Sequence, residues 1–132
     1  MTPVFLVDRS LGRRGVPAGL RSAGWELVTL AEHYGQPDDE RVADETWLAD
    51  AGRRGWAVLM KDERIRYRSA EIAALRSLRV HAFCLARGNL RIDEMVAMFV
   101  RYQAAIFDIC TDNEGPTLHV ISGAGMRAVD LA

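Results

Sequence analysis

Short apolar runs alternate with longer amphipathic segments along the chain. The apolar runs are rich in Val, Leu, Ile and aromatic residues and predict β-strands at residues 4–7, 25–30, 56–62, 80–86, 118–121 and 127–131. The amphipathic segments predict helices at residues 17–24, 44–54, 69–79 and 92–110. Strand–helix alternation of this kind builds a parallel sheet with helices on both faces. The sequence therefore predicts an α/β fold, a three-layer α/β/α sandwich with a mainly parallel central sheet.

Turn and cap residues set the boundaries of these segments. Pro17 opens the first helix and Gly24 ends it, because proline suits the start of a helix and glycine its end. Asp44 is predicted to cap the second helix, which Gly55 ends. Residues 33–41 contain Gly35 and Pro37 and predict a loop.

The composition limits the class of protein. With 132 residues and 49% hydrophobic content, the chain is long enough to bury a core, and we expect one domain over residues 1–132. A net charge of −1 argues against a wholly basic nucleic-acid coat. Without an apolar stretch of transmembrane length or a signal-peptide pattern, we expect a cytoplasmic protein with no membrane association. Cys84 and Cys110 are too far apart for a zinc site or a redox pair.

Acidic residues stand where apolar runs end. Asp8 follows the first predicted strand, and Asp62 closes the third. Asp44 and Glu45 begin the helix that follows the second strand. Strand carboxyl ends and the following helix N-termini share one edge of such a sheet, so we expect these carboxylates to converge there. Like charges about 4 Å apart repel by about 4 kcal/mol at an effective dielectric of about 20, so the group favours Mg²⁺ or Mn²⁺.

Basic residues follow both aspartates. The candidates for phosphate binding are Arg9, Arg13, Arg14, Lys61, Arg64, Arg66 and Arg68. Tyr67 lies among them, and an unpaired RNA base stacks well on such a side chain. The alternative is that the arginines form surface ion pairs with acidic residues 38–40 and that Tyr67 is a core or rim residue.

The placement of the acids resembles that of PIN-like domains, metal-dependent ribonucleases common among bacterial VapC-type toxins. The resemblance covers most of residues 4–90 and includes the opening Phe5-Leu6-Val7-Asp8-Arg9-Ser10-Leu11-Gly12. It implies that Asp8, Glu45 and Asp62 are catalytic metal ligands, with Asp44 as the competing candidate at the helix start. The whole chain would then be a single PIN-like domain.

Two departures from the family pattern concern the site. PIN domains usually carry Thr or Ser two residues before the third acid, and here that position is Met60. Their fourth acid has no clear match, with Glu71 and Asp93 as the options. A one-metal site is therefore better supported than a two-metal site.

The resemblance also implies an activity and partners. It predicts a Mg²⁺- or Mn²⁺-dependent endoribonuclease that hydrolyses RNA phosphodiester bonds and is neutralised by a protein antitoxin. The apolar helix at residues 92–110 offers a surface around Met95, Met98 and Tyr102 for that antitoxin or for a second copy in a homodimer.

Other interpretations of the same residues stay open. Asp44 suits a helix N-cap, Glu45 a first helical turn and Asp8 a loop cap, none of which needs a metal ion. A non-catalytic PIN-like domain that binds RNA or protein is the main rival. A receiver-like phosphoacceptor domain ranks last, because Asp8 stands alone after the first strand and no lysine follows Lys61.

Overall fold

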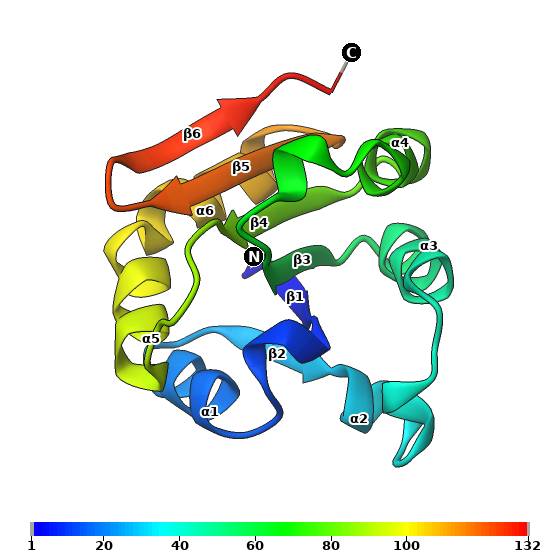
Figure 1. The fold of residues 1–132 in the computed structure, drawn as a ribbon, viewed down its shortest axis with the longest axis horizontal. Coiled ribbons are helices and arrows are strands. Elements are labelled where there is room, and N and C mark those ends of the chain that lie inside the picture. Colours follow the sequence, from blue (N-terminus) through cyan, green and yellow to red (C-terminus); the bar gives the residue numbers. More distant parts are fainter. Residues whose placement is uncertain (1, 132) are drawn as a thin grey trace.

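A computed structural model describes residues 2–131 and shows the predicted alternation of strands and helices (Figure 1). The strands are β1 (Val4–Val7), β2 (Glu26–Thr29), β3 (Ala57–Lys61), β4 (His81–Leu85), β5 (Thr117–Ser122) and β6 (Gly125–Val129). The α-helices are α1 (Gly15–Ser22), α2 (Leu30–Tyr34), α3 (Asp44–Arg54), α4 (Ser69–Leu78), α5 (Ile92–Arg101) and α6 (Gln103–Asp112). Three short 3-10 helices lie in the connections, η1 (Arg9–Leu11), η2 (Asp38–Glu40) and η3 (Ile65–Tyr67).

The strands form one six-stranded sheet in the order β2-β1-β3-β4-β5-β6. All neighbours pair in parallel except β5 and β6, which form an antiparallel hairpin at one edge. The strand β1 therefore lies between β2 and β3, with Val7 opposite Leu59. This topology confirms the predicted α/β class with a mainly parallel sheet.

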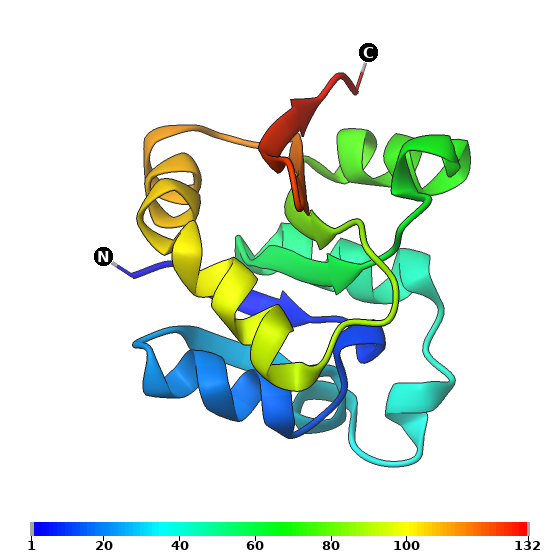
Figure 2. The ribbon, with the colours of Figure 1, turned by 60° about the vertical axis from the view of Figure 1, so that its left-hand side comes forward.

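Helices cover both faces of the sheet, as parallel strands buried on both sides require (Figures 1 and 2). Helices α1, α5 and α6 lie on one face, where Phe5, Phe83 and Phe99 are fully buried. Helices α3 and α4 lie on the other face, where Trp47 and Leu75 are buried. The structure thus has three layers, with an apolar core on each side of the sheet.

Some predicted boundaries are wrong. The helix expected over residues 92–110 is two helices, because Tyr102 leaves the helical conformation at φ −106° and ψ 14°. The loop expected over residues 33–41 contains the end of α2 and the whole of η2, and His33 is helical. The first helix begins at Gly15, before Pro17.

Two glycines shape the layer that carries α3 and α4. Gly55 ends α3 in the left-handed conformation, with φ 70°, as the sequence predicts. Gly52 lets the two helices approach closely, because a Cβ atom there would lie 2.8 Å from the carbonyl oxygen of Leu78. Over residues 2–131, every helix is too short or too polar to cross a bilayer.

Candidate active site

The sheet places two aspartates side by side at its carboxyl edge. Asp8 follows β1, and its backbone N–H donates a 3.0 Å hydrogen bond to the carbonyl oxygen of Leu59 in β3. Asp62 follows β3, and its N–H donates a 3.0 Å hydrogen bond to the carbonyl oxygen of Leu85 in β4. The hydrogen-bond pattern of the sheet thus continues for one residue beyond β1 and β3. These bonds fix the backbones of Asp8 and Asp62 relative to each other.

Two helix N-termini bring further acids to the same edge. Asp44 is the first residue of α3, and Glu71 lies in the first turn of α4. Asp44 is not the N-cap that we predicted: Ala43 holds that position, and Asp44 Oδ1 instead accepts a 3.1 Å hydrogen bond from Trp47 Nε1. The helix start therefore leaves the Asp44 carboxylate facing the site.

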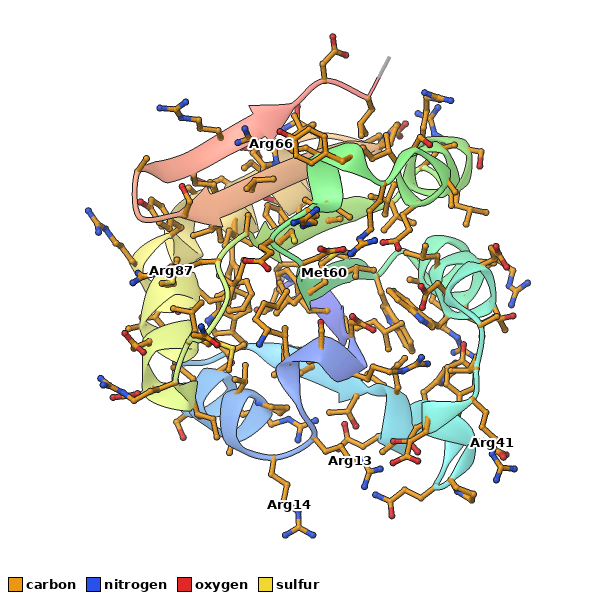
Figure 3. The ribbon with its side chains drawn as sticks, in the orientation of Figure 1. Arg13, Arg14, Arg41, Met60, Arg66 and Arg87 are labelled. Atoms are coloured by element: carbon orange, nitrogen blue, oxygen red, sulfur yellow. The ribbon has the colours of Figure 1, made fainter. Side chains whose placement is uncertain are left out.

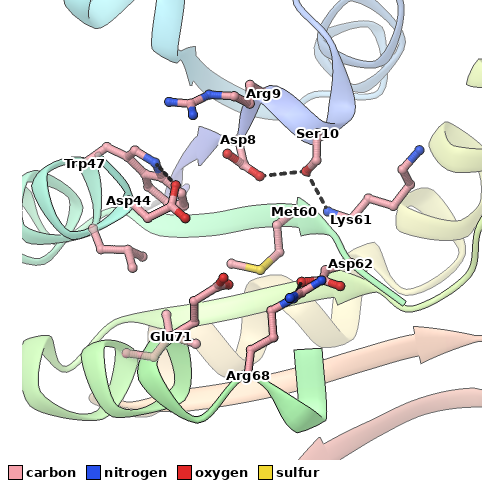
Figure 4. A pocket seen from close by; sticks show the side chains of 12 residues that line it. Asp8, Arg9, Ser10, Asp44, Trp47, Met60, Lys61, Asp62, Arg68 and Glu71 are labelled. Carbon is pink, nitrogen blue, oxygen red and sulfur yellow. Dashed lines mark hydrogen bonds and ion pairs between the residues drawn. The ribbon is translucent and has the colours of Figure 1, made fainter. Parts of the chain in front are cut away.

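These residues surround one pocket with a volume of about 390 Å³ (Figure 4). The lining residues are Asp8, Arg9, Ser10, Asp44, Trp47, Leu48, Met60, Lys61, Asp62, Arg68, Glu71 and Leu75. Figure 4 shows Asp8 and Glu71 approaching the space beside Met60 from opposite sides, with Asp44 near its rim. Four carboxylates from four different segments thus share one pocket.

The carboxylates influence one another through this pocket. Burial raises the pKa of Asp8, and the charge of Asp44 raises it further, while a hydrogen bond from Ser10 lowers it. The pKa of Glu71 is also raised, first by burial and then by the charges of Asp44 and Asp62. In their ionised forms, Asp8 and Glu71 are therefore repelled by the neighbouring carboxylates of the pocket.

Ser10 supplies a hydroxyl group where Met60 has none. Its Oγ donates a 2.7 Å hydrogen bond to Asp8 Oδ2 and accepts a 3.0 Å hydrogen bond from the Lys61 backbone N–H. Met60 is 5% exposed and packs in the core below the pocket. Ser10 thus orients the Asp8 carboxylate and ties it to the end of β3.

The donor set suits a hard divalent cation, because all four acids offer oxygen. Within residues 2–131, however, no three His, Cys, Asp or Glu side chains are close enough to form a candidate metal cluster. Asp8 is bound to Ser10, Asp44 to Trp47 and Asp62 to Arg68. The acids therefore fit Mg²⁺ or Mn²⁺ in chemistry, and they surround the pocket without meeting in its centre.

Three of the predicted phosphate-binding residues line the pocket. They are Arg9, Lys61 and Arg68. The Arg9 guanidinium also donates a 2.7 Å hydrogen bond to the carbonyl oxygen of Val42, just before α3. Arg68 Nε donates a hydrogen bond to Asp62 Oδ2, so this cation forms an ion pair with a candidate ligand.

The other predicted site residues lie outside the pocket lining. Glu45 is exposed and is not among the lining residues, although it is next to Asp44. Arg13 forms ion pairs with Asp39 at 3.0 Å and Glu40 at 2.6 Å, which is the alternative that the sequence left open. Figure 3 shows Arg14 extending away from Met60. Arg64 and Arg66 are also exposed and do not line the pocket.

The sequence contains signals for Glu71, which we offered only as an option for the fourth acid, and for Ser10, which we did not predict as a site residue. Glu71 lies in the first turn of the helix after Asp62, so the rule that placed Asp44 at the sheet edge applies to it equally. Asp93, the other option for a fourth acid, is exposed and pairs with Arg91 at 3.1 Å. Ser10 stands two residues after Asp8, the position whose backbone an aspartate side chain commonly bonds in a tight turn, so its hydroxyl group lies close to the Asp8 carboxylate.

Comparisons with known proteins agree with this geometry. A family model described as a PIN like domain matches residues 3–87, which hold β1 to β4 and the four pocket acids. Over 102 residues, the chain is 36% identical to "Putative ribonuclease VapC45" of Mycobacterium tuberculosis, a match that covers 77% of this chain and 74% of that protein. No solved structure matches the chain. The resemblance seen in the sequence is confirmed, and the chain belongs to the PIN-like domain family.

Proposed function

We propose that this protein is a VapC-type toxin, an endoribonuclease that hydrolyses RNA phosphodiester bonds with Mg²⁺ or Mn²⁺. One observation carries the proposal: four carboxylates, Asp8, Asp44, Asp62 and Glu71, come from separate segments and line a single pocket. The match to a relative named as a ribonuclease supports the reaction class. The whole chain would then be one catalytic domain, since a single sheet contains all the strands from β1 to β6.

The acids of the pocket are the candidates for holding the cation. Asp8, Asp44 and Asp62 would be the ligands, with Glu71 as the fourth acid. A divalent cation bound there would neutralise charge on the phosphate and lower the pKa of the attacking water. We favour Asp44 over Glu45 as the ligand from α3, because Asp44 lines the pocket and Glu45 does not.

Other lining residues would bind the phosphate groups of RNA or orient the carboxylates. Arg9 and Lys61 place positive charge beside the acids, where it attracts the phosphate groups of RNA. Ser10 holds the Asp8 carboxylate in one orientation, in which this carboxylate faces the pocket. Trp47 does the same for Asp44 through its indole N–H.

Adjacent residues of α3 provide a matched test of this assignment. We expect Asp44→Asn to lower the rate of metal-dependent cleavage of single-stranded RNA by at least about 100-fold, since one anionic oxygen of a hard-cation site is lost. Glu45→Gln removes the same charge one residue away and should keep nearly the wild-type rate. Cleavage assays with purified proteins in Mn²⁺ and in chelator measure both. Equal loss in the two variants, or loss only in Glu45→Gln, would show that the α3 ligand is misassigned.

The second candidate is a non-catalytic PIN-like domain that binds RNA or protein. The ion pair between Arg68 and Asp62 favours this candidate, because it leaves fewer carboxylate oxygens in the pocket free to bind a metal ion. This candidate predicts RNA binding without cleavage in either Mg²⁺ or Mn²⁺. The same assay therefore decides between the two functions.

The proposed partners are RNA and a protein antitoxin. The apolar surface that we predicted on residues 92–110 is smaller than expected, because Met95 is 6% exposed and packs in the core. Ile92 and Val100 of α5 are the large apolar side chains that stay exposed there, at 54% and 38%. They are the positions at which an antitoxin or a second copy would contact this helix.

A further inference from the structure

Of the three cationic side chains that line the acidic pocket, Arg68 forms an ion pair with a candidate metal ligand. Arg68 directly precedes α4, and its Nε donates a hydrogen bond to Asp62 Oδ2 (Figure 4). Both residues line the same pocket as Asp8, Asp44 and Glu71. The guanidinium therefore binds a carboxylate oxygen that the proposed function assigns to a divalent cation.

The charge of Arg68 reaches beyond Asp62. Its positive charge lowers the pKa of Glu71, against the charges of Asp44, Asp62 and Asp8, which raise it. In a pocket with four acids, this guanidinium partly compensates the repulsion between carboxylates. Arg68 thus performs, in part, the electrostatic task of a bound cation.

The contact is also easy to exchange. The Arg68 side chain is 47% exposed and Asp62 is 19% exposed, and ion pairs so open to water contribute little to stability. Asp62 has a second anchor, since its Oδ1 accepts a 2.9 Å hydrogen bond from the Arg64 backbone N–H. The carboxylate therefore keeps its place when the guanidinium leaves.

We propose that Arg68 is a built-in counter-ion, which occupies Asp62 in the metal-free protein and is displaced when a divalent cation enters the pocket. This inference rests on the proposed function, because it takes the pocket as the metal site. It assigns Arg68 a role in setting metal affinity that is separate from contact with RNA. Because guanidinium and cation compete for one carboxylate, removal of the guanidinium should tighten metal binding.

Calorimetric titration of the full chain with Mn²⁺ tests the competition without measuring catalysis. We expect Arg68→Gln to bind Mn²⁺ about fivefold more tightly than wild type, the effect of losing a competing, water-exposed ion pair. Arg66→Gln is the matched control: it removes the same charge two residues away from a side chain that does not line the pocket. Its affinity should stay within about twofold of wild type. Equal or weaker binding by Arg68→Gln, or equal tightening in both variants, overturns the proposal.

A second measurement follows Arg68 itself in the wild-type chain. We expect titration with diamagnetic Mg²⁺ to shift the nuclear magnetic resonance signal of the Arg68 Nε–H group, identified by its loss in Arg68→Gln. A signal that stays fixed while Mg²⁺ saturates the protein rules out displacement but leaves the nuclease function standing. If wild type binds neither Mn²⁺ nor Mg²⁺, the nuclease function fails and this inference fails with it.

Discussion

Ser10 shows how one hydroxyl group can serve both the fold and the site. It lies between Asp8 and the Lys61 backbone, two segments that are far apart in the sequence, and bonds to both. Its hydrogen bond to Asp8 stabilises the ionised carboxylate against the effect of burial, which raises the pKa of that group. Ser10 therefore favours the ionised form of Asp8 and orients its carboxylate at the same time.

We expect Ser10→Ala to lower the free energy of unfolding by about 1–3 kcal/mol, because the Lys61 N–H loses its acceptor and Asp8 its donor. The pKa of Asp8 should rise further in this variant, so activity should fall most at the acidic end of its pH range. Urea denaturation and pH–rate profiles measure the two effects. Ser77→Ala is the control, since Ser77 bonds only within its own helix at an exposed position. A Ser10→Ala variant as stable as the control would remove Ser10 from this role.

At the scale of elements, η3 joins the acidic pocket to an exposed basic surface. It follows Asp62 and carries Tyr67, which is 84% exposed, so the core position considered from the sequence is wrong. Arg66 and Arg68 flank Tyr67. Proteins that bind single-stranded nucleic acid combine exposed aromatic rings with positive charge, so we propose Tyr67 as a residue on which an RNA base stacks.

We expect Tyr67→Ala to weaken binding of single-stranded RNA by about tenfold, within the ~1–3 kcal/mol that stacking of one base contributes. Tyr67→Trp should keep or improve binding, and neither change should alter stability, because the ring has few contacts to lose. Fluorescence anisotropy with a labelled oligoribonucleotide in chelator, which prevents cleavage, measures the affinities. The idea is wrong if the alanine and tryptophan variants bind equally well.

Element boundaries show what hydrophobic periodicity can and cannot predict. Ile92, Val96, Phe99 and Ile106 keep a helical spacing on both sides of Tyr102, so the pattern predicts one helix. The break lies in backbone angles that side-chain identity does not report, and it turns the chain between α5 and α6 while both stay on the same face. By contrast, the end of α3 was predictable, because Gly55 has a conformation that other residues rarely adopt.

On the scale of the whole molecule, topology determined which parts of the site were predictable. Asp8 and Asp62 follow neighbouring parallel strands, and the carboxyl ends of such strands share one edge, so the sequence alone predicts that the two acids lie together. The choice between Asp44 and Glu45 depends on which side of a helix turn faces the pocket, and the sequence left it open. The pair between Arg68 and Asp62 depends on side-chain reach across a loop and was not predictable.

The whole pocket also has a cost in stability that depends on pH. The folded state raises the pKa values of Asp8 and Glu71, so it favours their protonated forms relative to the unfolded chain. The contribution of Asp8 and Glu71 to the free energy of unfolding is therefore fully present below the ordinary carboxyl pKa. It is lost as the pH rises through the raised pKa values of the folded state. Metal-free protein is therefore less stable at neutral pH than it would be without these raised pKa values.

We expect Glu71→Gln to melt at a higher temperature than wild type at pH 7 in chelator, and the advantage to disappear near pH 4, where Glu71 is protonated in wild type. Other carboxylates, such as Glu32, have a lowered pKa and act in the opposite direction, so only the difference between variant and wild type isolates Glu71. Glu45→Gln is the matched control, because it removes an exposed charge outside the pocket. Saturating Mn²⁺, at about 100 times its dissociation constant, should stabilise wild type by about 2.7 kcal/mol and should stabilise Glu71→Gln by less, reversing the order of the melts. Should Glu71→Gln and Glu45→Gln melt alike at both pH values, the pocket carries no such repulsion and the acids act independently.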